Sequence, residues 1–140
     1  MMLQWKNSVA ANMPEYWTAK IVYSNLMFSW SWVIRCSKSS NNLYTCAGLP
    51  TEDVAKISCE EFLIRNHILS IGDWTCEGRK HLLRCNNFIA VIRHYKHLTT
   101  WEIFHSNCSL LQNGKSTKAE CKNYVEVLLC AMIAENLRQS

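Results

Sequence analysis

Eight cysteines constrain the fold of this 140-residue chain more than any other feature of its sequence. Their number is even, and they cover all of the chain after the first 35 residues. Disulfides persist in oxidising compartments and are rare in the cytosol, so this pattern predicts a secreted, extracellular protein with paired cysteines. The cysteines expected to form disulfides are Cys36, Cys46, Cys59, Cys76, Cys85, Cys108, Cys121 and Cys130.

Turn residues are scarce, which favours helices over strands. The chain has only four glycines and two prolines, whereas a protein of many short strands needs frequent turn residues. Apolar residues make up 49% of the chain, a globular composition with enough material for one core. We therefore predict an all-α fold, a disulfide-stapled bundle of about four to five amphipathic helices. No internal repeat of fixed long period is evident.

Apolar spacing and capping residues locate the expected helices. Thr51 is suited to cap a helix with Glu52 and Asp53 in its first turn. Thr117 and Glu120 have the spacing of a capping box. The expected helical segments span residues 14–34, 51–71, 73–95, 99–113 and 117–137.

We expect the chain to divide into an N-terminal helical segment, residues 1–35, and a cysteine-rich helical domain, residues 36–140. The most apolar stretch, IVYSNLMFSWSWVI, begins at Ile21 and is interrupted by serine and asparagine. It is too short and too polar to span a bilayer, and no small-residue cleavage site follows it. We interpret it as a core helix. The alternatives are a poor uncleaved signal or leader, or a misassigned start.

Two pairs of cysteines, Cys76 with Cys85 and Cys121 with Cys130, lie nine residues apart on expected helices. Nine residues of helix rise about 13.5 Å, while the α-carbons of a disulfide lie within roughly 7 Å. Each helix is therefore expected to be linked to two different neighbours. The connectivity stays open, because eight cysteines allow many pairings.

A zinc site is the alternative use of one cysteine. His94, His97, His105 and Cys108 form H-x2-H followed by H-x2-C, and imidazole and thiolate are zinc ligands. However, the chain has no C-x2-C, the spacing of most structural zinc sites, and Cys108 is more useful as a disulfide partner. We expect neither a metal nor a cofactor.

Two surface features are predicted. Trp30 and Trp32, two residues apart on an expected helix, cannot both point into one core. We expect one of them to face a partner, a lipid or another helix, and we predict that the two form a contact patch. Asn107-Cys108-Ser109 is an N-x-S triplet and makes Asn107 the expected glycosylation site of a glycoprotein.

Motifs of catalysis are absent from the sequence, which has no G-x-S-x-G, no H-E-x-x-H and no glycine-rich phosphate loop. The basic residues from Arg79 to Lys96 would spread round a helix, so we expect no nucleic acid. We predict a secreted protein that is not an enzyme and binds another protein, such as a receptor, a matrix component or a host target. The alternatives are an extracellular carrier of a small apolar ligand and an intracellular protein with reduced thiols.

Overall fold

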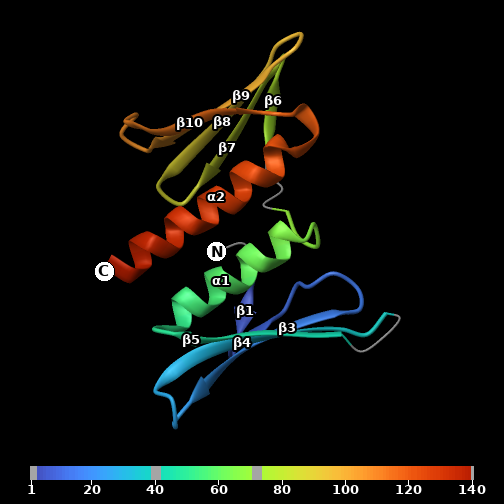
Figure 1. Ribbon diagram of the computed structural model, residues 1–140, viewed down its shortest axis with the longest axis vertical. Helices are drawn as coiled ribbons and strands as arrows, with labels where there is room; N and C mark the ends of the chain where they lie inside the picture. Colours follow the sequence, from blue (N-terminus) through green and yellow to red (C-terminus); the bar gives the residue numbers. More distant parts are fainter. Residues whose placement is uncertain (1–2, 39–41, 71–73, 140) are drawn as a thin grey trace. The chain divides into compact units, whose positions relative to one another are not determined.

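The computed structural model describes residues 3–38, 42–70 and 74–139. Its contacts divide the chain into two compact units, which are described separately (Figure 1). The first unit comprises Met1–Leu69 with Cys130–Ser140, and the second comprises Ser70–Leu129. The expected boundary at residue 35 falls inside a strand of the first unit.

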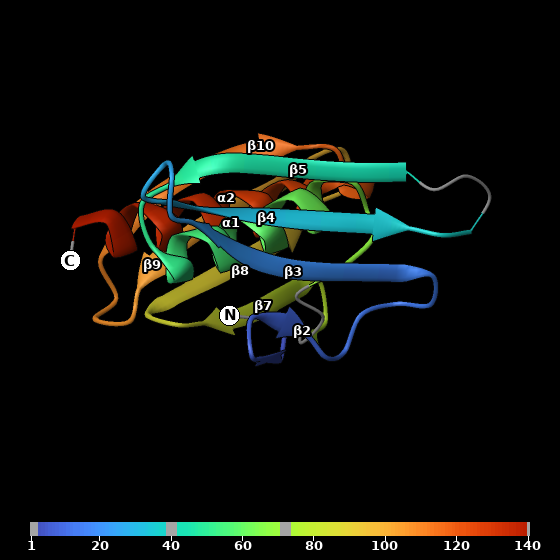
Figure 2. The same cartoon turned by 90° about the horizontal axis from the view of Figure 1, so that it is seen from below.

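The first unit contains a five-stranded antiparallel sheet, sheet A, whose strands follow one another in chain order. Helix α1 packs against its three long strands, which lie side by side in Figure 2. Ala19, Ile21 and Ile34 from the sheet meet Val54 and Leu63 from the helix in a buried core. The elements are β1 (Trp5–Lys6), β2 (Val9–Ala10), β3 (Trp17–Ser24), β4 (Ser29–Cys36), β5 (Asn42–Leu49) and α1 (Glu52–Arg65).

The second unit contains another five-stranded antiparallel sheet, sheet B, again with its strands in chain order. Ala90, Ile92 and Ile103 are fully buried in its sheet, as are Cys121 and Val125 in the helix that follows. The elements are β6 (Thr75–Glu77), β7 (Lys80–Cys85), β8 (Phe88–His94), β9 (Thr99–His105), β10 (Leu110–Ser116) and α2 (Lys118–Gln139), whose last residues are assigned to the first unit.

The all-α prediction is wrong, and three of the five expected helices are strands. The stretch interpreted as a core helix from Ile21 is the β3–β4 hairpin, in which buried Trp32 and Ile34 alternate with more exposed Ser31 and Val33. This is the two-residue period of a strand and not the period of a helix. Residues 74–95 and 99–113 likewise form strands joined by turns, and residue 73 lies outside the described residues.

Glycine scarcity misled the prediction because other residues make the turns. Asn7, Asn86 and Cys108 have φ of 52°, 52° and 72°, the left-handed conformation that glycine usually supplies. Asparagine is the residue that replaces glycine there most readily. A sheet whose strands are joined by short turns can therefore form in a chain with only four glycines.

The two remaining expected helices are present as α1 and α2. The capping role of Thr51 is confirmed, since its side chain accepts a hydrogen bond of 3.1 Å from the backbone nitrogen of Val54. Glu52 and Asp53 lie in the first turn, where the helix dipole favours negative charge. No helix among the described residues is long and apolar enough to cross a membrane.

The two units repeat one plan, five consecutive antiparallel strands followed by a helix, although no repeat of fixed period is evident in the sequence. Buried Trp32 and Ile34 on the fourth strand match Trp101 and Ile103 on the ninth. In the helices, buried Glu60 and Leu63 follow Thr51 at the same distance at which Glu126 and Leu129 follow Thr117. Few matching positions hold the same residue in the two units, which explains why the repeat is not evident from the sequence alone.

The predicted disulfides are also wrong: no disulfide links any of the eight cysteines, all of which lie in the described residues. The sheet register keeps Cys36 and Cys46 apart, because Cys36 lies opposite Asn42 and Cys46 lies opposite Trp32. The helical cysteines are buried and pack as small apolar residues; these are Cys59, Cys121 and Cys130. The secreted, extracellular assignment thereby loses the observation on which it rested.

Candidate functional site

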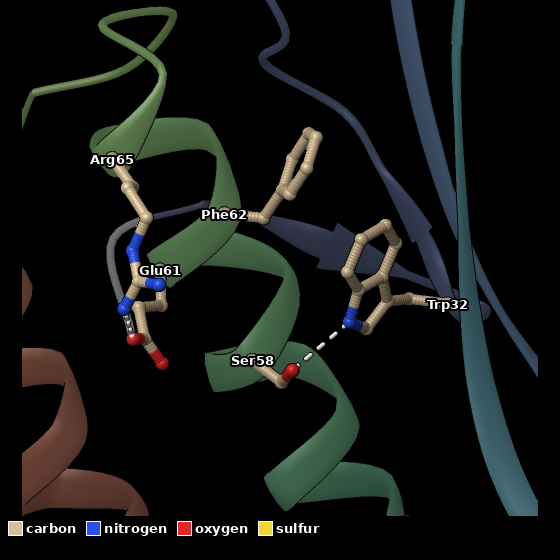
Figure 3. Close-up of a pocket in the computed structure, with 5 residues that line it drawn as sticks. All are labelled: Trp32, Ser58, Glu61, Phe62 and Arg65. Carbon is tan, nitrogen blue, oxygen red and sulfur yellow. Dashed lines mark hydrogen bonds and ion pairs between the residues drawn. The ribbon is translucent and has the colours of Figure 1, made fainter. Parts of the chain in front are cut away.

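A pocket of about 180 Å³ opens between β4 and α1 of the first unit (Figure 3). Trp32 forms its wall on the sheet side, and the other lining residues come from α1. Ser58, Glu61, Phe62 and Arg65 stand at positions i, i+3, i+4 and i+7 of the helix, so their side chains share one face. These residues span about two turns of α1, which form the second wall of the pocket.

The polar groups of the pocket bind one another. The indole Nε1 of Trp32 donates a hydrogen bond of 3.0 Å to Ser58 Oγ, which satisfies the one polar atom of a side chain that is 4% exposed. Arg65 and Glu61 form an ion pair one helical turn apart at the rim. The apolar lining of the pocket comes from the rings of Trp32 and Phe62, whose centroids are 5.0 Å apart.

The aromatic wall continues across the sheet. Tyr44 of β5 contacts Phe62 with ring centroids 5.2 Å apart, and it stacks on Trp17 of β3 at 6.4 Å. Aromatic contacts of this kind contribute about 0.5–1.5 kcal/mol beyond the area they bury. The wall is therefore a rigid surface beside the pocket.

The size of the pocket limits what it can hold. A dry engineered cavity of about 150 Å³ binds benzene, whereas ligand sites usually measure about 300–1,000 Å³. The pocket beside Phe62 therefore has room for one ring or one aliphatic side chain. That is the footprint of a single anchoring residue from a peptide or protein.

A second feature of the same unit is the turn of the β3–β4 hairpin. Leu26, Met27 and Phe28, which we call the hairpin tip, are 92%, 73% and 80% exposed. Phe28 has φ of 49°, a conformation that is costly for a bulky residue. Behind the tip, the rings of Tyr23 and Trp30 pack with centroids 5.0 Å apart.

The two tryptophans of the predicted contact patch lie on β4 and not on a helix. Residues two apart on a strand point to the same side, so the argument that Trp30 and Trp32 must diverge does not apply. Trp32 is buried and lines the pocket, while Trp30 is partly buried against the core. Their role in binding a partner stays a prediction.

The four residues of the zinc alternative lie at the two ends of one hairpin. His94 is opposite Thr99 at one end of β8–β9, and His105 is opposite Phe88 at the other. His97 and Cys108 lie in the turns after β8 and after β9 respectively, so each is next to one histidine only. Within the described ranges, no group of three or more His, Cys, Asp or Glu residues is placed to hold a metal.

Asn107 is exposed in the turn that joins β9 to β10. Its Oδ1 accepts hydrogen bonds from the backbone nitrogen and the hydroxyl of Ser109, at 3.0 and 2.6 Å. Its glycosylation stays a prediction.

No protein family, curated protein or solved structure matches the chain. Sequence reasoning did not single out Ser58, Phe62 and Arg65, although their spacing on an expected helix was visible. What was missing was the strand on which Trp32 faces them, and only the fold supplies it.

Proposed function

We propose that the protein acts by binding another protein, and that the hairpin tip inserts into an apolar groove of that partner. The observation that carries this proposal is the exposure of Leu26, Met27 and Phe28 side by side on one turn. Single exposed apolar residues are ordinary, but contiguous ones indicate a contact site. Full burial of each such side chain is worth about 1.5–3 kcal/mol.

The backbone at Phe28 supports the same role. A non-glycine residue in the left-handed region costs of order 1–3 kcal/mol and persists mainly where function demands the side chain. In the free protein the ring of Phe28 is 80% exposed and so gains little from burial. A partner that covers the ring would bury it, and this burial would offset the cost of the left-handed backbone at Phe28.

Charge favours a protein over a lipid surface as the occupant. Peripheral membrane binding uses basic residues to attract anionic lipids. The stretch from Ile21 to Ile34 carries no charged residue at all. Leu49 lies opposite Trp30, and the chain continues from Leu49 into the first turn of α1. That turn carries the acidic residues Glu52 and Asp53, which do not attract anionic lipids.

The pocket beside Phe62 is the second contact that this proposal assigns, with room for one side chain of the partner. The neighbouring aromatic wall and Arg65 at the rim fit this role, since tryptophan, tyrosine and arginine are enriched at binding hot spots. The alternative, a carrier of a small apolar ligand, stays a prediction that a pocket of about 180 Å³ does not favour.

The test begins with a photo-crosslinking amino acid at position 26 in cells that express the protein, with the same amino acid at exposed Leu110 as the control. The protein that cross-links from position 26 alone is then purified and titrated against wild type and a variant carrying Leu26→Ser and Phe28→Asn. We expect the affinity to fall about tenfold or more in the variant. The variant should fold as stably as wild type, because both side chains are exposed and asparagine accepts the left-handed backbone.

Three outcomes would contradict the proposal. The first is equal affinity of the variant and wild type for the cross-linked protein. The second is binding of wild type to phosphatidylcholine–phosphatidylserine vesicles that the variant loses. The third is self-association in sedimentation runs that the variant abolishes, which would make the occupant a second copy of this chain.

A further inference from the structure

The outer face of sheet A, away from α1, holds a second hollow of about 160 Å³. Its walls come from three neighbouring strands. The lining residues are Val9, Thr18, Ala19, Lys20, Val33 and Arg35.

The register brings two cations together in this hollow. Thr18 lies opposite Arg35, and Lys20 lies opposite Val33, on the paired strands β3 and β4. Because side chains alternate along a strand, these four side chains share one face, while buried Ala19 belongs to the other. Lys20 and Arg35 are therefore diagonal neighbours, within reach of one small ligand.

Neither cation is neutralised within the part of the chain that the structure describes. Lys56, Arg65 and Arg93 form ion pairs there, and neither Lys20 nor Arg35 is among the residues of those pairs. Lys20 and Arg35 are both exposed, and no carboxylate lines the hollow with them. Two like charges at this separation repel each other, so a bound anion would relieve the repulsion.

The remaining lining residues suit an oxyanion. The Thr18 hydroxyl is a hydrogen-bond donor, and the arginine guanidinium presents a fork of donors that matches the oxygens of a phosphate. Val9 and Val33 supply apolar walls, which weaken the competition from water. We propose that this hollow, the cationic groove, binds a phosphate-type oxyanion, either free phosphate or the phosphate group of a monoester.

The second unit shows that the fold does not impose such a groove. There Arg93 on the outer face of β8 lies diagonal to Glu102 on β9 and forms an ion pair with it. In the repeated plan Glu102 of β9 takes the place that Val33 has in β4, one residue after the matching tryptophan. By the same matching, Val91 and Phe104 take the places of Lys20 and Arg35, so neither groove position in sheet B holds a cation.

The test is a titration of the purified full chain in low-salt chloride buffer. The ligands are inorganic phosphate, phenyl phosphate and phosphoserine, and binding is measured by the shifts of the backbone amide NMR signals. Lys20→Gln and Arg35→Gln are compared with Lys115→Gln, an exposed cation on β10 of the other sheet. We expect phosphate to shift the amides of β3 and β4. Each groove variant should weaken binding by about tenfold, and Lys115→Gln should leave it unchanged.

The ligands distinguish the two sources of the phosphate group. Tighter binding of the monoesters than of inorganic phosphate would assign the groove to a phosphorylated molecule, and the reverse order would assign it to the free ion. Binding that all three variants weaken equally would overturn the proposal, because it would reflect net charge alone. Absence of shifts in β3 and β4 at saturating phosphate would also overturn it. Circular dichroism of each variant shows that loss of binding is not loss of folding.

Discussion

Ser58 and Tyr124 occupy the same place in the two helices but treat the tryptophan that faces them differently. Ser58 accepts the indole hydrogen bond of Trp32 at 3.0 Å. Tyr124 instead contacts the ring of Trp101, with centroids 5.6 Å apart, and the buried Trp101 Nε1 has no hydrogen-bond partner among the described residues. One serine hydroxyl thus decides whether a buried donor is satisfied in this fold.

The variant Ser58→Ala should lower the free energy of unfolding by about 1–2 kcal/mol. The change removes the acceptor and leaves the Trp32 donor buried, which costs the desolvation of that group. Urea unfolding followed by tryptophan fluorescence measures the effect, and Ser106→Ala in an exposed turn is the matched control. A loss no larger than that of the control would mean that water replaces the hydroxyl at the pocket.

At the scale of elements, the sequence predicted the helices and missed the strands. Thr51 with two acidic residues after it is typical of a helix start, and α1 begins there. The strands were hidden because Asn7 and Asn86 make turns without glycine, and because buried sheet positions such as Ile34 sit in runs with short polar interruptions. Thr99 and Glu102 also have the spacing of a capping box, which predicts a helix start, but both lie in strand β9, where Thr99 is buried. The pocket residues on α1 were predictable as one helical face, but Trp32 was not predictable as their partner.

Strands β7 and β8 place two histidines near the start of α2. His81 and His94 touch edge to face, with ring centroids 5.0 Å apart, and His94 Nδ1 lies 3.0 Å from Thr99 Oγ1. Desolvation lowers the pKa of both rings, and the positive charges of Lys118 and Lys122 lower it further. The charge of His94 also contributes to the lowered pKa of His81.

The second unit should therefore lose stability as the pH falls below the ordinary histidine pKa of about 6.5. The unfolded chain binds the protons first, so the free energy of unfolding decreases until the folded rings also titrate. In Lys122→Gln this decrease should be smaller between about pH 7.5 and 5, because one of the charges that lowers both pKa values is gone. Urea unfolding across this range measures it, with Lys96→Gln in the β8–β9 turn as the control. An unchanged slope would show that the charge of Lys122 does not reach the histidines.

At the scale of the whole molecule, one plan is used twice and the two units have diverged. Where the first unit has Glu61 and Phe62 beside its tryptophan, the second has Val127 and Leu128 at the matching helix positions. Sheet A carries two unneutralised cations, and sheet B carries an arginine paired with a glutamate. The features assigned to binding are thus concentrated in the first unit, and the fold itself does not require them.

The redox state of the whole chain gives the prediction that separates the structure from the disulfide interpretation. Alkylation under denaturing conditions without reductant should label all eight cysteines, since no disulfide links them in the fold. Under native conditions exposed Cys76 and Cys108 should react quickly, while Cys59 should stay unlabelled. Burial, with a smaller contribution from the charge of Glu60, raises the pKa of the Cys59 thiol to about 12 and suppresses the reactive thiolate.

Mass spectrometry of the alkylated protein from its native source distinguishes the two states. Burial also raises the pKa of Cys121, so slow labelling of the helical cysteines and fast labelling of exposed Cys76 and Cys108 is the pattern that this fold predicts. Pairs of cysteines that resist alkylation until reductant is added would contradict the structure directly. A disulfide between Cys36 and Cys46 would require β4 and β5 to pair in another register, because the present one holds Cys36 opposite Asn42 and Cys46 opposite Trp32.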